Sequence, residues 1–354
     1  MAFQIRKFID CSLNDVFFDT LREDYPGFDK WFGEKSDSGA VAHVYLEEGA
    51  IQAFMYVKDY ECEPVGDMPE SSRMKIGTLK VCEDVARRRI AEGAIGIALW
   101  KWQRSDLNEI YITVLPKHRL TVELLESFGF VHKGKKGEEN VYLKDKNSLN
   151  HTDAKKLFPY LNPNYSRGRY IPIDDKYHDQ MFQYSDLKNT QQVREDFPVS
   201  NGITKNYIAT PSSGLRHAPG DIAFIYRIHN GPGSKKHRSV VTSYCTITKV
   251  IPIRVAGWKL KKYDEFISVA GNKTVFTPEE LKKAYTKSNV YVIEMVYNGY
   301  FGEGKNITFD ALSSLGLFDK HPYGIEIDRK NVLKILEMGG KCEHDIVVDQ
   351  SRAR

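Results

Sequence analysis

Apolar and polar positions follow two periods along the first 150 residues. Period-two alternation predicts a hairpin of two strands over residues 40–60, with its turn near Glu48-Gly49. Short apolar runs predict further strands over residues 74–81, 109–115 and 139–144. Apolar residues at helical spacing predict helices over residues 12–21, 91–105 and 120–128. Strand–helix–strand order implies parallel crossovers, whereas the hairpin is antiparallel. The pattern therefore predicts a mixed α/β domain over residues 1–148.

The pattern changes after residue 148. Residues 149–200 are rich in Pro, Asn and Tyr, which predicts a connecting segment wrapped on a domain surface. β-branched runs then predict strands over residues 219–228, 237–253 and 289–297. Thr277 and Asp328 are suitable N-caps for helices. This order predicts a small β-barrel with peripheral helices over residues 201–340, followed by a tail over 341–354.

Composition sets limits on the class of protein. The chain has 354 residues, 41% of them hydrophobic, which suggests two domains with real cores. It contains no apolar run of membrane-spanning length and no secretory signal at its start, MAFQIRKFIDCS. The five cysteines are scattered without metal-ligand spacing. We therefore expect a cytoplasmic protein with free thiols, no metal and no membrane association.

Charge is unevenly divided between the two halves. Residues 1–150 carry 21 Lys and Arg against 25 Asp and Glu, and residues 151–354 carry 30 against 22. A basic second half suggests a polyanionic partner, although ordinary variation gives the same excess.

Three consecutive arginines follow the predicted strand in LKVCEDVARRRIAEG. They precede a predicted helix, whose first amides are unpaired and whose dipole disfavours cations there by about 0.3–1 kcal/mol each. An anion beside them would remove this penalty, so we predict a phosphate site at Arg87, Arg88 and Arg89. The alternative is a helix with a solvated cationic start.

The same stretch resembles the acetyl-coenzyme A signature of the GNAT superfamily of N-acetyltransferases, L-x-V-x-x-x-x-[QR]-x-x-G-x-[GA]. Leu79, Val81 and Ala91 fit it, whereas Ala86 replaces Gln or Arg and Arg89 replaces Gly. The EGAIGIALWKW helix, the IYITVL strand and the ELLESFGF…ENVYLK ending follow the superfamily's order. The resemblance covers about residues 1–146.

This resemblance implies a sheet splayed open around acetyl-CoA, from which an amine takes the acetyl group directly. The pantetheine arm would pair with the strand edge, and backbone amides at the helix start would hold the pyrophosphate. The implied cofactor-binding residues are Leu79, Val81, Arg87, Arg88, Arg89, Ile90, Ala91 and Glu92.

The superfamily's general acid, a tyrosine, is replaced by Leu125. We consider His118, Tyr111 and Ser127 as catalytic candidates, because each carries a side chain that can transfer a proton. His118 is equally consistent with a surface loop, and Tyr111 with the core. The sequence leaves the acceptor substrate undecided. The basic residues Lys117–Arg119 would suit a polyanionic substrate. The acidic cluster of Glu61, Glu63 and Asp67 would suit a cationic amine, or it is a solvated loop.

The second half resembles the PUA-like group of small barrels, in particular the ASCH and EVE branches, over about residues 200–335. The resemblance lies in PGDIAFIYRI, HRSVVTSYCTITKV and KTVFTPEEL, and it implies binding of RNA or modified bases. Basic and aromatic residues that could contact phosphates and bases are Lys205, Tyr207, Arg227, Lys235, Lys236 and Arg238. Alternatively, the tyrosines are core residues and the SKKHR loop is solvated.

These observations favour an acetyl-CoA-dependent N-acetyltransferase, with an RNA- or tRNA-linked amine presented by the second domain. Two alternatives are a nucleic-acid-binding protein with a degenerate transferase domain and an N-acetyltransferase for proteins or small molecules.

Overall fold

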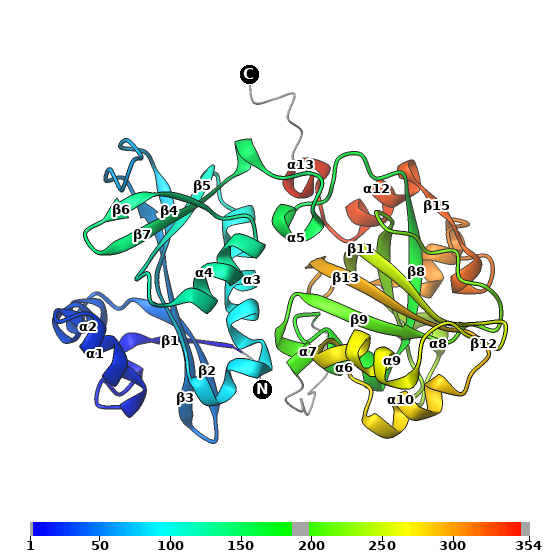
Figure 1. The fold of residues 1–354 in the computed structure, drawn as a ribbon. Coiled ribbons are helices and arrows are strands. Elements are labelled where there is room, and N and C mark those ends of the chain that lie inside the picture. Colours follow the sequence, from blue (N-terminus) through cyan, green and yellow to red (C-terminus); the bar gives the residue numbers. More distant parts are fainter. Residues whose placement is uncertain (1–2, 186–197, 348–354) are drawn as a thin grey trace. The chain divides into compact units, whose positions relative to one another are not determined.

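The computed structural model describes residues 3–185 and 198–347, apart from the side chains of Ala86, Arg87 and His344. The chain divides into two compact units, Met1–Ser148 and Leu149–Arg354 (Figure 1). Each unit is a mixed α/β fold built on its own open sheet. No helix in the described parts of the chain is both long and apolar enough to cross a bilayer.

The first unit has a seven-stranded sheet of order β1-β2-β3-β4-β5-β7-β6. Its strands are β1 (Gln4–Lys7), β2 (Val41–Glu47), β3 (Ala50–Glu61), β4 (Arg73–Val81), β5 (Glu109–Val114), β6 (Val131–Lys136) and β7 (Glu139–Asp145). The hairpin predicted at Glu48-Gly49 is confirmed, because both residues have positive φ at the β2–β3 turn. Only β4 and β5 run parallel. Pattern reading missed β1 and β6, which are mostly exposed and lack alternation.

The helices of the first unit are α1 (Asp19–Asp24), α2 (Phe28–Asp37), α3 (Ile90–Gln103) and α4 (Arg119–Ser127). The predicted helices at 91–105 and 120–128 are confirmed as α3 and α4. The helix predicted over 12–21 is wrong, because the Asp15 side chain accepts from Phe17 N and begins a 3₁₀ turn, Val16–Phe18, ahead of α1. Aromatic rings fill a core to which α1, α2, β2 and β3 contribute, including Phe8, Phe18, Phe32 and Phe54.

The second unit has a sheet of order β15-β8-β10-β11-β13-β9, and β12 and β14 also pair with β11. Its strands are β8 (Arg167–Asp174), β9 (Thr204–Ala209), β10 (Ile222–Ile228), β11 (Val240–Val255), β12 (Trp258–Lys259), β13 (Val290–Tyr300), β14 (Ile307–Thr308) and β15 (Ile327–Asp328). The strand order does not close on itself, so the predicted barrel is not seen among the described residues. The gap between β9 and β8 is bridged by the Tyr207 hydroxyl, which donates to Pro172 O at 2.8 Å.

The segment 149–200 is more than a connection. Its strand β8 pairs in parallel with all of β10, and Tyr170, Ile171 and Ile173 are buried. Two arginines and Pro172 interrupt the apolar pattern of β8, which is why pattern reading missed this strand.

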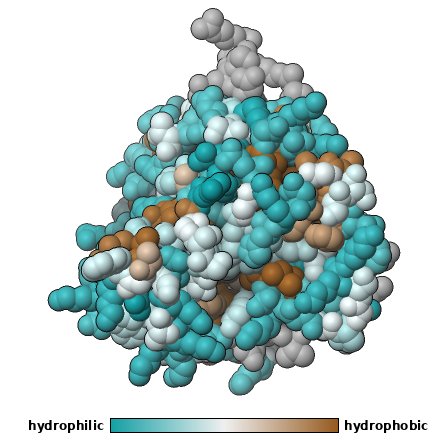
Figure 2. Space-filling view, turned by 90° about the vertical axis from the view of Figure 1, so that its right-hand side faces the viewer, coloured by the Kyte–Doolittle hydropathy of each residue, from teal (hydrophilic) through white to brown (hydrophobic). Residues whose placement is uncertain are grey.

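The helices of the second unit are α5 (Ala154–Leu157), α6 (Asp175–Met181), α7 (Pro198–Asn201), α8 (Lys235–Arg238), α9 (Tyr263–Ala270), α10 (Pro278–Tyr285), α11 (Phe309–Ser314), α12 (Arg329–Met338) and α13 (Glu343–Ile346). The predicted N-caps are confirmed: the Thr277 hydroxyl accepts from Glu280 N, and the Asp328 carboxylate accepts from Asn331 N. In the region predicted to be a tail, α13 ends beside the buried Val347, which bridges to Leu161. Figure 2 shows one face of this unit, which is mostly hydrophilic with separated apolar patches.

The stability of the first unit is expected to fall in acid because of His43 on β2. Burial, helped by Lys101, lowers the pKa of His43 from 6.5 to about 4. Between these values the unfolded chain binds more protons, so stability falls as pH drops, by up to about 3 kcal/mol. We expect His43→Gln to remove most of this loss in urea unfolding at pH 7 and pH 4.5. His132→Gln, which changes an exposed histidine, is the control; an unchanged pH dependence in His43→Gln would contradict the assignment.

Candidate active site

The parallel strands β4 and β5 separate halfway along their length. They pair only over Arg73–Ile76 and Glu109–Ile112. Beyond this point β4 continues to pair with β3 as far as Val81, but it has no partner on its β5 side. Alternate backbone amides and carbonyls of Gly77–Val81 therefore lie along an open strand edge, which can bind an extended ligand as an added strand would.

A cavity of about 1110 Å³ lies at this opening. Its walls come from both separated strands and from the segment around α1, and they include Leu79, Lys80, Val81, Thr113, Val114, Tyr25, Trp31 and Glu139. The volume is at or above the upper end of the range of about 300–1,000 Å³ typical of small-molecule sites. A long cosubstrate and an acceptor therefore have room in it together.

His118 lies at this cavity beside a buried carboxylate. It precedes α4, and its Nε2 lies 2.9 Å from Asp24 Oδ2 at the end of α1. The Lys117 ammonium also pairs with Asp24. Burial opposes ionisation of Asp24, but the hydrogen bonds from Lys117 and His118 outweigh it and lower its pKa. An ionised Asp24 orients the imidazole, whose Nδ1 can then exchange a proton at the cavity.

Other polar groups line the same cavity. The Tyr25 hydroxyl donates to Glu139 Oε1 at 2.8 Å, and burial together with this bond raises the pKa of the phenol. Burial also lowers the pKa of the Lys80 ammonium, which donates to Phe17 O. Sequence reasoning missed Asp24, Tyr25 and Glu139, because their segments carried signals only for the end of the helix predicted over 12–21 and for the strand predicted over 139–144.

The other two catalytic candidates lie away from the cavity. Tyr111 is buried in a cluster with Val65, Met68, Val141 and Leu143, which fits the core alternative. The Ser127 hydroxyl donates to Leu124 O at 2.7 Å within α4. Leu125, which replaces the superfamily's tyrosine, is fully buried. Of the three candidates, the structure brings only His118 to the opening.

The arginine stretch has carboxylate partners of its own. It forms a 3₁₀ turn, Glu83–Arg88, ahead of α3. Arg88 Nη1 contacts both oxygens of Glu47 at 2.8 and 2.9 Å, and Arg89 binds Glu92 Oε2 through Nε and Nη2 at 2.9 and 2.6 Å. Carboxylates of the protein itself therefore provide the negative charge that the dipole argument expected beside these two guanidinium groups. The Arg87 side chain lies outside the described residues.

Arg89 adopts the left-handed backbone conformation, with φ of 60°, at the position where the GNAT signature has glycine. This conformation costs a non-glycine residue about 1–2 kcal/mol. A glycine would adopt this conformation at less cost, and the buried Arg89–Glu92 pair lies at the same turn. Ile90, Ala91 and Glu92 follow as the first turn of α3, where the helix dipole places partial positive charge.

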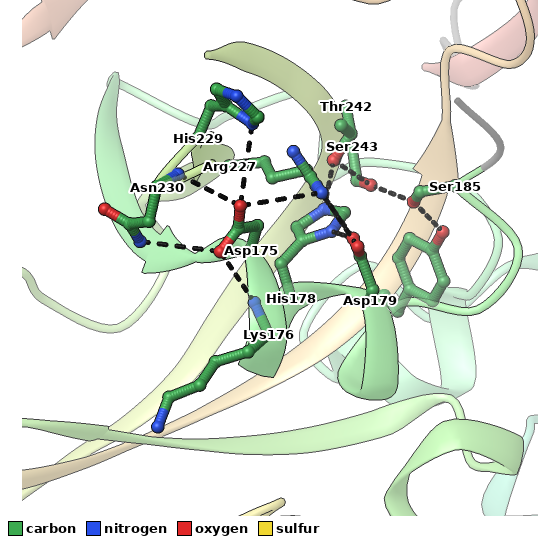
Figure 3. Close-up of polar contacts among 11 residues, drawn as sticks. Asp175, Lys176, His178, Asp179, Ser185, Arg227, His229, Asn230, Thr242 and Ser243 are labelled. Carbon is green, nitrogen blue, oxygen red and sulfur yellow. Dashed lines mark hydrogen bonds and ion pairs between the residues drawn. The ribbon is translucent and has the colours of Figure 1, made fainter. Parts of the chain in front are cut away.

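Three of the residues predicted to bind nucleic acid are engaged inside the second unit. Lys205 is fully buried and donates to Val199 O. Arg227 forms two bonds of 2.8 Å with Asp179 (Figure 3). The Tyr207 hydroxyl bridges to Pro172 O. The polar ends of all three are therefore bound within this unit and form no outward-facing basic surface; the core alternative, which concerned the tyrosines, fits Tyr207.

The other three predicted nucleic-acid residues lie on the exposed helix α8. Lys236 pairs with Asp310 at 2.7 Å, and Arg238 donates to Pro232 O at 2.7 Å. Lys235 is exposed at the start of the helix. This short helix is therefore the only part of the predicted set that solvent reaches readily among the described residues.

No family model matches the chain, and no curated protein matches its sequence. Solved acetyltransferase structures align with about 40% of it. An N-acetyltransferase from Thermoplasma acidophilum in complex with coenzyme A is 14% identical over 41% of this chain and 99% of its own, with a TM-score of 0.28. A putative acetyltransferase from Salmonella typhimurium with acetyl-CoA is 11% identical over 41% and 94%, with a TM-score of 0.30. A GNAT-family acetyltransferase from Streptococcus agalactiae is 15% identical over 40% and 95%, with a TM-score of 0.32. At such low scores the chemistry of this chain must rest on its own residues.

Proposed function

We propose that residues 1–148 transfer an acetyl group from acetyl-CoA to an amine. The observation that carries the proposal is the separation of β4 from β5, with an open strand edge on a cavity of about 1110 Å³. The pantetheine arm, which contains amides, would pair with the backbone of Leu79 and Val81. Backbone amides over residues 88–92 would hold the pyrophosphate, because the guanidinium groups of Arg88 and Arg89 already have carboxylate partners.

In this reaction the amine nitrogen forms a bond to the thioester carbonyl carbon, and the carbon–sulfur bond breaks. A backbone amide of the open edge stabilises the negative charge that develops on the carbonyl oxygen. His118 takes the proton that a cationic amine must lose before its nitrogen attacks, with Asp24 holding the imidazole in place. The second N–H proton leaves to solvent once the carbon–nitrogen bond has formed. The departing thiolate takes a proton from solvent or from a donor in the cavity.

We propose a small-molecule or protein amine as the acceptor, in place of one linked to RNA. Lys205, Tyr207 and Arg227 are engaged in the interior of the second unit, so the basic surface that would have presented RNA loses half of its members. The cavity lining carries more carboxylates than ammonium groups, with Asp15, Glu23, Glu83 and Asp84 beside Asp24 and Glu139 against Lys75, Lys80 and Lys117, which suits an amine that arrives as a cation.

Acetyl-CoA is expected to raise the melting temperature of the full chain, and acetyl transfer to a pool of amines should be detectable by mass spectrometry. Thr113→Tyr places a ring in the opening and should abolish the thermal shift, whereas Val131→Tyr on exposed β6 should retain it. Arg88→Glu should also abolish the shift, because it places two carboxylates side by side at Glu47 near the pyrophosphate position. Absence of a shift in the parent chain would refute the proposal.

A further inference from the structure

A second cavity, of about 390 Å³, lies within the second unit. It is formed where the sheet fails to close, between the ends of β8 and β9, and it is completed by α6, the segment before α10 and the 3₁₀ turn Pro322–Gly324. The Tyr207 hydroxyl spans this gap to Pro172 O. The cavity therefore exists because side chains, and not strand pairing, join the two ends of the sheet.

Aromatic rings form much of its wall, namely Tyr177, Tyr207, Phe276 and Tyr323. Tyr177 and Phe276 lie with ring centroids 5.1 Å apart. The described lining contains no Lys or Arg, although this half of the chain is basic; it includes His321, and its one carboxylate is the exposed Asp174, whose Oδ1 accepts from Asn230 Nδ2 at 3.0 Å. Lys176 lies 4.2 Å over the Tyr177 ring, but it is itself paired with Glu280 at 3.9 Å. The wall therefore combines π faces with a negative charge.

The hydrogen-bond roles of the polar wall are largely fixed. Tyr207 donates to Pro172 O, so Tyr323 must donate the 2.6 Å bond between the two hydroxyls. Tyr177 donates to Glu280, and both hydrogens of the Asn206 amide go to backbone carbonyls. The buried Asn206 Oδ1 has no hydrogen-bond partner among the described residues. Burial raises the pKa of Tyr323 to about 12, so its phenol stays neutral. What these groups can still offer a ligand is acceptor oxygens.

From this wall we propose that the cavity binds an organic ammonium group, held by cation–π contact with the rings and by the Asp174 carboxylate. Aromatic faces attract such cations, and the acceptor oxygens of Asn206 and Asp174 suit a ligand that brings positive charge and N–H or C–H groups. The site does not depend on acetyl transfer in the first unit, so either proposal can fail alone.

The test is calorimetric titration of the full chain with choline and with its uncharged isostere, 3,3-dimethylbutan-1-ol. Choline should bind saturably, and the neutral isostere about tenfold more weakly or worse. Asp174→Asn should weaken choline about fivefold, and Phe276→Leu should weaken it similarly. Asp264→Asn, an exposed carboxylate on α9 outside the cavity, is the matched control and should change nothing.

Three outcomes would overturn the proposal: no saturable binding of choline, equal binding of the neutral isostere, or choline binding that survives both Asp174→Asn and Phe276→Leu. Titration with cytidine separates an ammonium site from one for neutral heterocycles. Tighter binding of cytidine than of choline would show that the cavity is a site for neutral heterocycles.

Discussion

Replacing His118 by Asn is expected to lower kcat for acetyl transfer by about 10²–10⁴-fold, the usual contribution of a general base. The affinity for acetyl-CoA should change little, because His118 lies across the opening from the β4 edge that would bind it. The physical reason is the Asp24–His118 contact of 2.9 Å at the cavity, which fixes the imidazole and leaves its other nitrogen for proton transfer. Kinetics at saturating acetyl-CoA with thermal shift as a binding check would measure both effects.

Controls separate this role from a structural one. Lys117→Met removes the other partner of Asp24 and should leave most of the rate. Because the His118 side chain is 44% exposed, imidazole added to His118→Gly should enter and restore part of the activity. Retention of the parental rate in His118→Asn would assign the proton transfer to another group at the cavity.

Local sequence signals predicted much of the first unit. Helical and strand periods identified β4, α3, β5 and α4 in order, whereas His118 was proposed as a catalytic candidate because of the resemblance to the GNAT superfamily. Asp24 could not be found in this way. Its role depends on a contact between residues 94 positions apart, which no local pattern encodes.

The arginines illustrate the same limit. The dipole argument called for an anion beside them and predicted a phosphate site, which stays a prediction, whereas the partner of Arg89 is Glu92, three residues later on the first turn of the helix. Glu47, the partner of Arg88, comes from the β2–β3 hairpin 41 residues earlier. Charge bias in the second half likewise predicted a surface, but Lys205 and Arg227 satisfy interior acceptors, because burial depends on tertiary packing.

A series of hydrogen-bonded, buried polar side chains in the second unit is a feature that composition did not predict. Starting at Tyr297, the hydroxyls of Ser185, Ser243 and Thr242 lead to His178, with contacts of 2.7, 2.5, 3.1 and 2.8 Å (Figure 3). His178 Nδ1 lies 2.8 Å from Asp179 Oδ1. Since a carboxylate only accepts, every donor in a chain with neutral His178 points toward Asp179. This carboxylate therefore sets the direction of the whole chain.

Asp179→Ala is accordingly expected to destabilise the second unit by about 3 kcal/mol, since it leaves the His178 N–H without its acceptor and Arg227 with only Asp175, 3.9 Å away. Burial opposes ionisation of Asp179, but Arg227 and His178 lower its pKa from 3.8 to about 2. The stabilisation it provides is thus complete above pH 3.8 and is lost as pH falls toward 2. Hydrogen exchange of peptides from α6, β10 and β11 should accelerate about a hundredfold or more near neutral pH.

The matched control is Asp310→Ala, which breaks the exposed Lys236–Asp310 pair of 2.7 Å in the same unit and should leave exchange nearly unchanged. Asp179→Leu combined with Arg227→Met should recover much of the stability, because removing both charges leaves no uncompensated ion. If Asp179→Ala accelerates exchange no more than Asp310→Ala does, the chain of hydrogen bonds contributes little. If the double variant is as unstable as the single one, the loss comes from packing and not from the stranded charge.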